Sequence, residues 1–255
     1  MNSLRVGNII ALIVTLIVNG LAGTTLLNGR TTAEVSDTYF TLITPAGYVF
    51  SIWGVIYILL AAFAIYQVLP SQKDKPCHKQ IGALFILSSI FNCVWLFLWQ
   101  YDYITLSVVV MFALLATLIS IYTRLGVGKS KAPLREKLLI QTPFSVYLGW
   151  ITIASIANVS AALVSLNWDG LGISAETWAV IVLALALVVA LAVIFTRRDI
   201  AYSLVIIWAL AGIAINQSSY PNIVLTAEVA IAIIIVTLSV SLIAYRLRQR
   251  RAATR

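Results

Sequence analysis

The chain has 255 residues, of which 61% are hydrophobic and only 10% are charged, whereas soluble domains are about 45–50% apolar and about 25% charged. The mean hydropathy of +0.99 agrees, and most of the chain is expected to lie in the hydrocarbon of a membrane. A net charge of +8 would suggest nucleic acid as a partner of a soluble protein. Here the basic residues flank apolar runs and no nucleic-acid motif appears, so we expect membrane lipid as a partner and no nucleic acid.

Apolar runs of about 20 residues, long enough to cross about 30 Å of hydrocarbon, occur eight times. They cover residues 7–27, 46–69, 80–100, 104–124, 138–166, 177–195, 200–217 and 222–245. Strands in such runs would leave backbone groups unpaired in lipid, so each run predicts a helix. The predicted fold is all-α: a polytopic bundle of eight transmembrane helices that forms a single transmembrane domain over residues 1–255.

The basic residues alternate between the two ends of these runs. If the N-terminus is cytoplasmic, every lysine and arginine of the 17 except Arg30 falls on the inner side. The inner residues are Arg5, Lys73, Lys75, Lys79, Arg124, Lys129, Lys131, Arg135, Lys137, Arg197, Arg198, Arg246, Arg248, Arg250, Arg251 and Arg255. A missing or extra span would swap the sides and destroy this bias. The positive-inside rule therefore predicts eight spans with both termini in the cytoplasm, and we expect an integral protein of a bacterial plasma membrane.

Two segments near the N-terminus have features beyond the charge pattern. Arg5, the apolar residues 9–21 and the small pair Ala22-Gly23 also fit a cleaved signal peptide. The connection 28–44 is the longest on the predicted outer side, and its polar composition fits a segment that folds over the outer mouth of the bundle.

No catalytic constellation is apparent. His78 is the only histidine, and it follows Cys77 in a basic loop without the second half of a metal site. Cys93 lies inside an apolar run, which argues against a disulfide framework. No nucleophile–base pair or glycine-rich phosphate loop occurs. We therefore expect no enzymatic activity, no metal and no resident cofactor.

Aromatic and amide side chains recur on one face of several runs. The face consists of Phe50, Trp53 and Tyr57 in the second run, Asn92 and Trp95 in the third, and Tyr147, Trp150 and Asn158 in the fifth. Phe50, Trp53 and Tyr57 stand at i, i+3 and i+7, so a helix places them on the same side. At about 1.5 Å rise per residue, these groups lie mostly in the outer half of the membrane. The seventh run repeats the spacing as Trp208-x-x-x-Gly212-x-x-x-Asn216.

The shared depth of these residues predicts one cavity with aromatic walls and a few polar groups, as small-molecule sites have. Two structural interpretations stay open. In one, the asparagines serve only to bond neighbouring helices. In the other, Trp95 and Trp99 fit an interfacial aromatic belt, an interpretation favoured for Trp99 by the adjacent Tyr101 and Tyr103. Glu228 is the only carboxylate clearly within a run. Such residues are functional candidates, although Glu228 is also close enough to the surface to be solvated.

Three motifs in order resemble the TspO/MBR family, the tryptophan-rich sensory proteins or translocator proteins. Residues 45–57 read PAGYVFSIWGVIY, similar to the family pattern P-x-W-V-F-x-x-V-W-x-x-L-Y. Residues 91–99 read FNCVWLFLW, similar to L-N-x-x-W-S-x-x-F. Pro143, Tyr147, Trp150, Ala154 and Asn158 match the spacing of the family's fourth helix. The resemblance covers about residues 45–196, with 1–44 and 197–255 as additional helices and a basic tail.

The resemblance implies a five-helix core, often a homodimer, that binds porphyrins and other hydrophobic ligands. It makes pocket residues of the matched positions Phe50, Trp53, Tyr57, Asn92, Trp95, Tyr147, Trp150 and Asn158. This chain departs from the family by one helix before the core and two after it. The family's aromatic lid loop is replaced by the basic segment 70–79.

The leading hypothesis is a membrane protein that binds a hydrophobic or aromatic small molecule, either porphyrin-like or lipid-like. Sensing or translocation of that molecule would be an extension of this hypothesis. The predicted site adds Trp208, Asn216 and Glu228 to the matched positions. One alternative is a secondary transporter coupled to protons through Glu228. The same Trp–Asn spacing occurs at Trp150/Asn158 and at Trp208/Asn216, and such repeats are common in transporters. The other alternative is a non-catalytic structural or assembly subunit, which solid packing of the tryptophan faces would favour.

Overall fold

A computed structural model describes residues 3–72 and 75–253, and this part of the chain is helical without strands. The long helices are α1 (Ser3–Gly23), α3 (Ile52–Val68), α5 (Leu84–Gln100), α6 (Ile104–Arg124), α8 (Thr142–Ser165), α9 (Ala175–Arg197), α10 (Ile200–Asn216) and α11 (Pro221–Ala253). Short segments join them: α2 (Thr32–Thr38), η1 (Gly47–Ser51), η2 (Pro70–Gln72), α4 (Pro76–Ile81), α7 (Leu134–Glu136), η3 (Lys137–Gln141) and η4 (Gly170–Gly172).

Within the described residues, six helices are long and apolar enough to cross a membrane. They are Ser3–Gly23, Gly47–Val68, Ile104–Arg124, Leu134–Ser165, Ala175–Arg197 and Pro221–Arg251. The other two apolar helices, α5 and α10, have 17 residues each. The all-helical class is confirmed, whereas the count of eight spans stays a prediction.

Several helix boundaries differ from the predicted runs. The run 80–100 is divided at Gly82, whose φ of 50° ends α4 before α5 begins, because a left-handed residue cannot continue a right-handed helix. The run 138–166 begins in the π-helical segment η3. The polar connection 28–44 contains α2, which starts with a capping box between Thr31 and Glu34. Beyond 245, α11 continues as a helix to Ala253.

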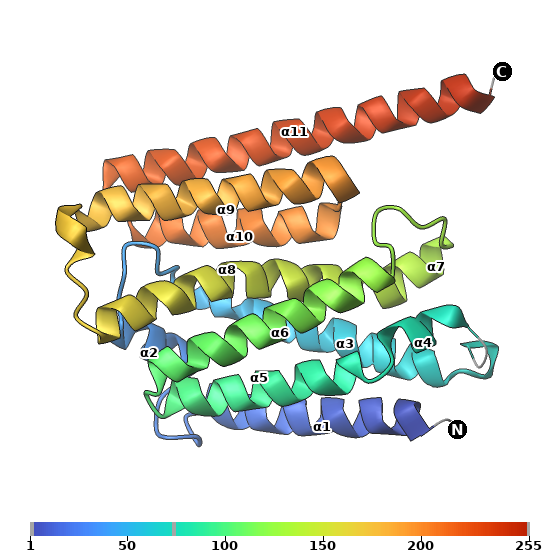
Figure 1. Cartoon of the computed structure of the whole chain (residues 1–255), viewed down its shortest axis with the longest axis horizontal. Helices are drawn as coiled ribbons and strands as arrows, with labels where there is room; N and C mark the ends of the chain where they lie inside the picture. Colours follow the sequence, from blue (N-terminus) through green and yellow to red (C-terminus); the bar gives the residue numbers. More distant parts are fainter. Residues whose placement is uncertain (1–2, 73–74, 254–255) are drawn as a thin grey trace.

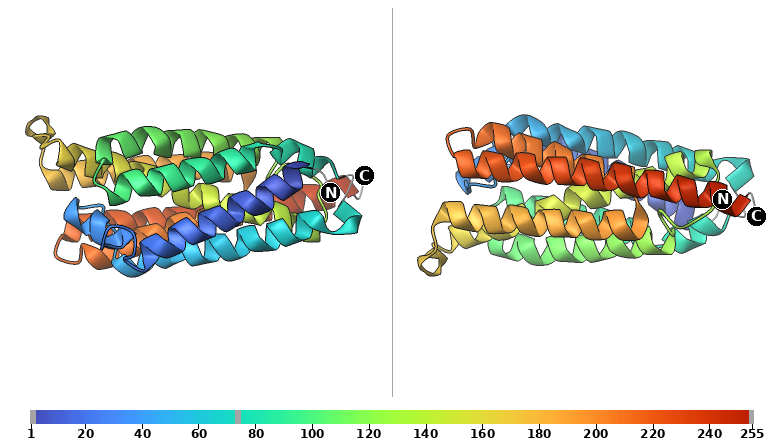
Figure 2. Two further views of the ribbon diagram at one scale, coloured as in Figure 1. Left: turned by 90° about the horizontal axis from the view of Figure 1, so that it is seen from below. Right: turned by 90° about the horizontal axis from the view of Figure 1, so that it is seen from above.

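The long helices run roughly parallel and antiparallel along one axis (Figure 1). α8 is central and packs against α3, α6 and α10, and every residue from 143 to 151 is buried, as expected for a helix that is apolar all round. α1 crosses obliquely over α3 and α5, and α11 covers α9 and α10 on the opposite side (Figure 2). An aromatic triad fills the core between α3, α5 and α8, with Phe63, Phe85 and Phe144 at centroid separations of 5.2–6.2 Å.

The two ends of the bundle differ in charge. The start of α1, the end of α11, α4, α7 and the α9–α10 turn lie at one end, here called the α4 end. α2, η1 and η4 lie at the other end, the α2 end (Figure 1). The basic segments gather at the α4 end, where Arg5 donates to the carbonyl of Gln72 at 2.6 Å and Arg197 donates to that of Val127 at 3.3 Å. Lys73 and Arg255 of the predicted basic side lie outside the described residues. The predicted outer side corresponds to the α2 end.

Candidate functional site

Trp53 of α3 lies at the centre of an aromatic cluster near the α2 end. Its ring stacks on Tyr57 of the same helix at a centroid distance of 5.6 Å and lies 6.1 Å from Trp95 of α5. Tyr147 and Trp150 of α8 meet it edge to face at 6.0 and 6.1 Å. All these separations fall within the favourable range for aromatic pairs. The predicted faces of three helices therefore meet one another.

Two further rings extend this group toward the α2 end. Phe50 packs edge to face against Trp150 at 5.8 Å, and Trp99 stacks on Trp95 at 5.8 Å. The Trp99 indole donates a hydrogen bond to the carbonyl of Thr32 in α2, so α2 closes this end. We use the name Trp53 cluster for Phe50, Trp53, Tyr57, Asn92, Trp95, Tyr147 and Trp150.

Burial differs across the Trp53 cluster. Trp95, Tyr147 and Trp150 are 3–4% exposed. Phe50, Trp53 and Tyr57, all from the α3 side, are only half-buried. The cluster is thus closed on the α5 and α8 sides and more accessible along α3.

Asn158 links helices through both atoms of its amide. Its Oδ1 accepts from the Trp95 indole at 2.9 Å and from the Ser107 hydroxyl at 3.3 Å, and its Nδ2 lies 2.8 Å from the Ser107 oxygen. It is 2% exposed, and both its amide oxygen and its amide nitrogen are hydrogen-bonded. These contacts agree with the structural interpretation of this residue, joining α5, α6 and α8.

Asn92 is held from one side only. Its Oδ1 accepts from Nδ2 of Asn19 in α1 at 2.7 Å, whereas its own Nδ2 is buried without a partner. Its amide lies near the phenol groups of Tyr57 and Tyr147. Asn19 was not among the predicted site residues, although the positions of Asn8, Thr15 and Asn19 on one face of α1 are a signal present in the sequence.

Trp208 and Asn216 of α10 lie away from Trp53 and hold the start of the α3 segment. The Trp208 indole donates to the carbonyl of Val49 at 3.1 Å, and Asn216 Nδ2 donates to that of Thr44 at 3.0 Å. Between them, the carbonyl of Gly212 accepts from the backbone amide of Ala46 at 3.1 Å. The polar groups of the α10 face are therefore bonded to the backbone of residues 44–49.

Glu228 is exposed on α11, which packs against α9 and α10. It is therefore not brought together with the Trp53 cluster. Its predicted role in ligand binding or proton coupling stays a prediction.

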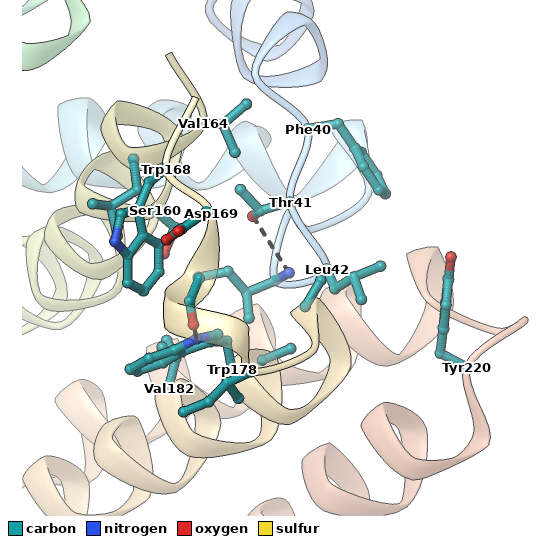
Figure 3. Close-up of a pocket in the computed structure, with 16 residues that line it drawn as sticks. Phe40, Thr41, Leu42, Ser160, Val164, Trp168, Asp169, Trp178, Val182 and Tyr220 are labelled. Atoms are coloured by element: carbon teal, nitrogen blue, oxygen red, sulfur yellow. Dashed lines mark hydrogen bonds between the residues drawn. The ribbon is translucent and has the colours of Figure 1, made fainter. Parts of the chain in front are cut away.

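Two cavities lie at opposite ends of the bundle, and neither is lined by a residue of the Trp53 cluster. The larger, about 470 Å³, lies at the α2 end between α8 and α9 (Figure 3). The smaller, about 240 Å³, lies at the α4 end and is lined by Cys77 and Glu136 among others. Burial, and then the neighbouring Glu136 carboxylate, raises the pKa of the Cys77 thiol to about 11. The described residues contain no group of three or more His, Cys, Asp or Glu side chains placed to hold a metal ion.

A family model described as "TSPO-like protein" matches residues 5–240. The match extends beyond the segment 45–196 that carries the motifs and takes in α10 and most of α1 and α11. Comparisons with curated proteins and with solved structures found no match. The family match covers most of the chain and agrees with the apolar helices and the meeting of the three aromatic faces. The chain therefore belongs to the TSPO-like protein family and is an integral membrane protein.

Proposed function

We propose that the protein binds a hydrophobic or aromatic small molecule that carries hydrogen-bond acceptors, and that the Trp53 cluster is the binding site. The observation that supports this most is a set of three buried polar atoms without partners. They are Tyr57 Oη, Asn92 Nδ2 and Trp150 Nε1, and all three belong to the cluster.

Unpaired buried polar groups are rare because each costs about 1–3 kcal/mol of desolvation. Other buried polar groups beside the cluster are paired, as the Trp95–Asn158–Ser107 contacts demonstrate, and three of the ten unpaired buried side-chain atoms among the described residues belong to the cluster. Two of the unpaired atoms are obligatory donors, an amide N–H and an indole N–H. A ligand with a carbonyl, carboxylate or ring nitrogen would satisfy them, and stacking on Trp53 and Tyr57 would supply the apolar part of the affinity.

The rings are in contact with one another, so a ligand needs space that Trp53 must provide by moving. Phe50, Trp53 and Tyr57 are the half-buried members, so displacement of Trp53 on the α3 side opens the cluster where it is already accessible. A porphyrin-like or lipid-like ligand is compatible with this mode. The same close packing favours a second candidate function, a non-catalytic structural or assembly subunit in which the cluster is a solid core.

The proposed membrane topology has eight spans with the α4 end in the cytoplasm. α5 and α10 have 17 residues each, the lower limit for a spanning helix. Both connect the two ends of the bundle in Figure 1, and the basic segments then share one side as the positive-inside rule requires. The Trp53 cluster would then face the outer half of the membrane.

Binding is tested on the purified full-length protein in non-ionic micelles by tryptophan fluorescence and calorimetry. Benzophenone and diphenylmethane form a matched pair that differs by a carbonyl acceptor, and a porphyrin tests the ligand class of the family. The informative variant is Tyr57→Phe, because Oη makes no hydrogen bond of normal length and angle, although the Asn92 amide lies nearby. We expect unchanged stability and about five- to tenfold weaker benzophenone binding, the value of one hydrogen bond.

Tyr103→Phe, at an exposed tyrosine outside the Trp53 cluster, is the matched control and should leave benzophenone binding unchanged. Diphenylmethane should bind more weakly than benzophenone and should not respond to Tyr57→Phe. Equal binding of the two compounds, with no response to Tyr57→Phe, would refute the proposed site and leave the structural function as the better one.

A further inference from the structure

The larger cavity at the α2 end, which plays no part in the proposed Trp53 site, has the features of a second ligand site. Its walls come from four separate parts of the chain: residues 40–43, the end of α8, the segment 168–182 and Tyr220 (Figure 3). α8 and α9 make few contacts with each other, and the space between their ends remains open. The volume of about 470 Å³ is in the range of small-molecule pockets.

A tight turn fixes the inner wall of this cavity. Gly170, Leu171 and Gly172 all have positive φ, at 74°, 56° and 76°. Asp169 Oδ1 accepts from the amide of Leu171 at 2.9 Å, and the Trp178 indole donates to the carbonyl of Gly170 at 2.8 Å. A non-glycine residue in this conformation indicates that the surroundings hold the turn in place. The wall therefore exists before any ligand arrives.

The turn brings aromatic rings and a carboxylate to the same cavity. The rings of Trp168 and Trp178 lie 5.1 Å apart at an angle of 58°, and Phe40 and Tyr220 line other parts of the wall. Asp169 is exposed and supplies the only charged side chain among the described lining residues. Aromatic faces attract cations through their quadrupole, and an acidic group beside them adds to that attraction.

We propose that this cavity binds an organic cation with an apolar body, such as a quaternary ammonium group attached to an aromatic ring. Trp168 and Trp178 contact the apolar body and the cationic group, and Asp169 supplies the counter-charge. The cavity shares no residue with the Trp53 cluster, and the inference does not depend on the function proposed for that cluster.

The charge of the surrounding surface agrees with a cationic ligand. Glu34, Asp37 and Glu176 also lie at the α2 end. Arg30 is the one basic residue that the sequence pattern assigns to this end, and its charge is paired with that of Asp102. The resulting negative field raises the local concentration of cations at the mouth of the cavity.

The test uses the purified full-length protein in non-ionic micelles, with calorimetry and tryptophan fluorescence. The probes are benzyltrimethylammonium and its neutral carbon isostere, neopentylbenzene. Asp169→Asn removes the charge but keeps an oxygen that can accept from the Leu171 amide. We expect this variant to bind the cation about fourfold or more weakly, because a charge pair about 5 Å apart is lost. Its affinity for the neutral isostere should be unchanged. Comparing variants in the same micelles cancels partitioning of the probes.

Asp37→Asn is the matched control, because it removes a charge from the same end without touching the cavity. It should change the affinity for the cation less than twofold. Trp168→Leu is the second variant, since the Trp168 ring is not needed for the Trp178–Gly170 hydrogen bond. It should lower the affinity for the cation several-fold. Soluble short-chain phosphatidylcholine also carries a quaternary ammonium group, so its competition with benzyltrimethylammonium would identify a lipid headgroup as an occupant, whereas no competition would identify a free cation. Equal binding of cation and isostere, or equal effects of Asp169→Asn and Asp37→Asn, would overturn the proposal.

Discussion

Gly212 marks the closest approach between α10 and the segment that leads into α3, and Gly212→Ala tests whether this contact holds the candidate site. A Cβ built at Gly212 would lie 2.1 Å from Val49 Cγ2. Ordinary van der Waals contact begins at 3.4 Å, so either the valine side chain or the helix must shift by about 1.3 Å, the difference between these distances.

The cost can be worked out from three contributions. Overpacking of this kind costs about 1–3 kcal/mol, and a shift would also weaken the hydrogen bond from Ala46 to the Gly212 carbonyl by about 1 kcal/mol. Alanine is favoured over glycine inside a helix by about 1 kcal/mol, which offsets part of the loss. We expect a net destabilisation of about 1–3 kcal/mol, together with displacement of Phe50, which follows Val49 in the chain.

The assay is thermal or detergent unfolding of the purified protein, with near-ultraviolet circular dichroism to follow the tryptophans. Gly54→Ala in α3 is the control, since a Cβ there meets no atom within 4 Å and should be neutral or stabilising. Val49→Ala removes the clashing methyl group and should make Gly212→Ala less costly in the double variant. If Gly212→Ala proves as harmless as Gly54→Ala, the close contact does not support α3 as argued.

Two other predictions concern buried polar groups. Asn158→Leu leaves the Trp95 indole without its acceptor, and we expect a loss of about 1–3 kcal/mol in unfolding free energy; an unchanged unfolding midpoint would contradict the linking role. The raised pKa of Cys77 predicts slow alkylation at pH 8, where about 0.1% of the thiol is ionised, with a rate that rises toward pH 11 in a Cys93→Ser background. Glu136→Gln lowers the pKa of Cys77 and should speed alkylation at pH 8, while a rate that levels off near pH 9 would contradict the shift.

The sequence was sufficient to predict the long helices and the aromatic faces of α3, α5 and α8. Apolar runs and 3.6-residue spacing are properties of single segments, and each can be read without knowing the neighbours. Gly82 was a missed signal of the same local kind, because a positive φ at glycine divides an otherwise continuous apolar run.

The bonding state of each asparagine could not be predicted in this way. Asn92 and Asn158 stand in similar aromatic patterns, yet both amide atoms of Asn158 are bonded, whereas Nδ2 of Asn92 has no partner. The difference comes from Ser107 and Asn19, which belong to other helices and lie 51 and 73 residues away in the chain. The larger cavity was missed for the same reason, since its walls come from four distant segments and none of them has a distinctive motif.

The helices outside the motif segment 45–196 bear directly on the candidate site. α1 supplies Asn19, which holds one side of the Asn92 amide and leaves the other side unpaired. α10 supplies Trp208 and Asn216, whose hydrogen bonds fix the backbone from which Phe50 and Trp53 project. Both supports would be lost in a chain reduced to the five-helix segment. The family match to residues 5–240 is thus consistent with a site that depends on the additional helices and not on the aromatic motifs alone.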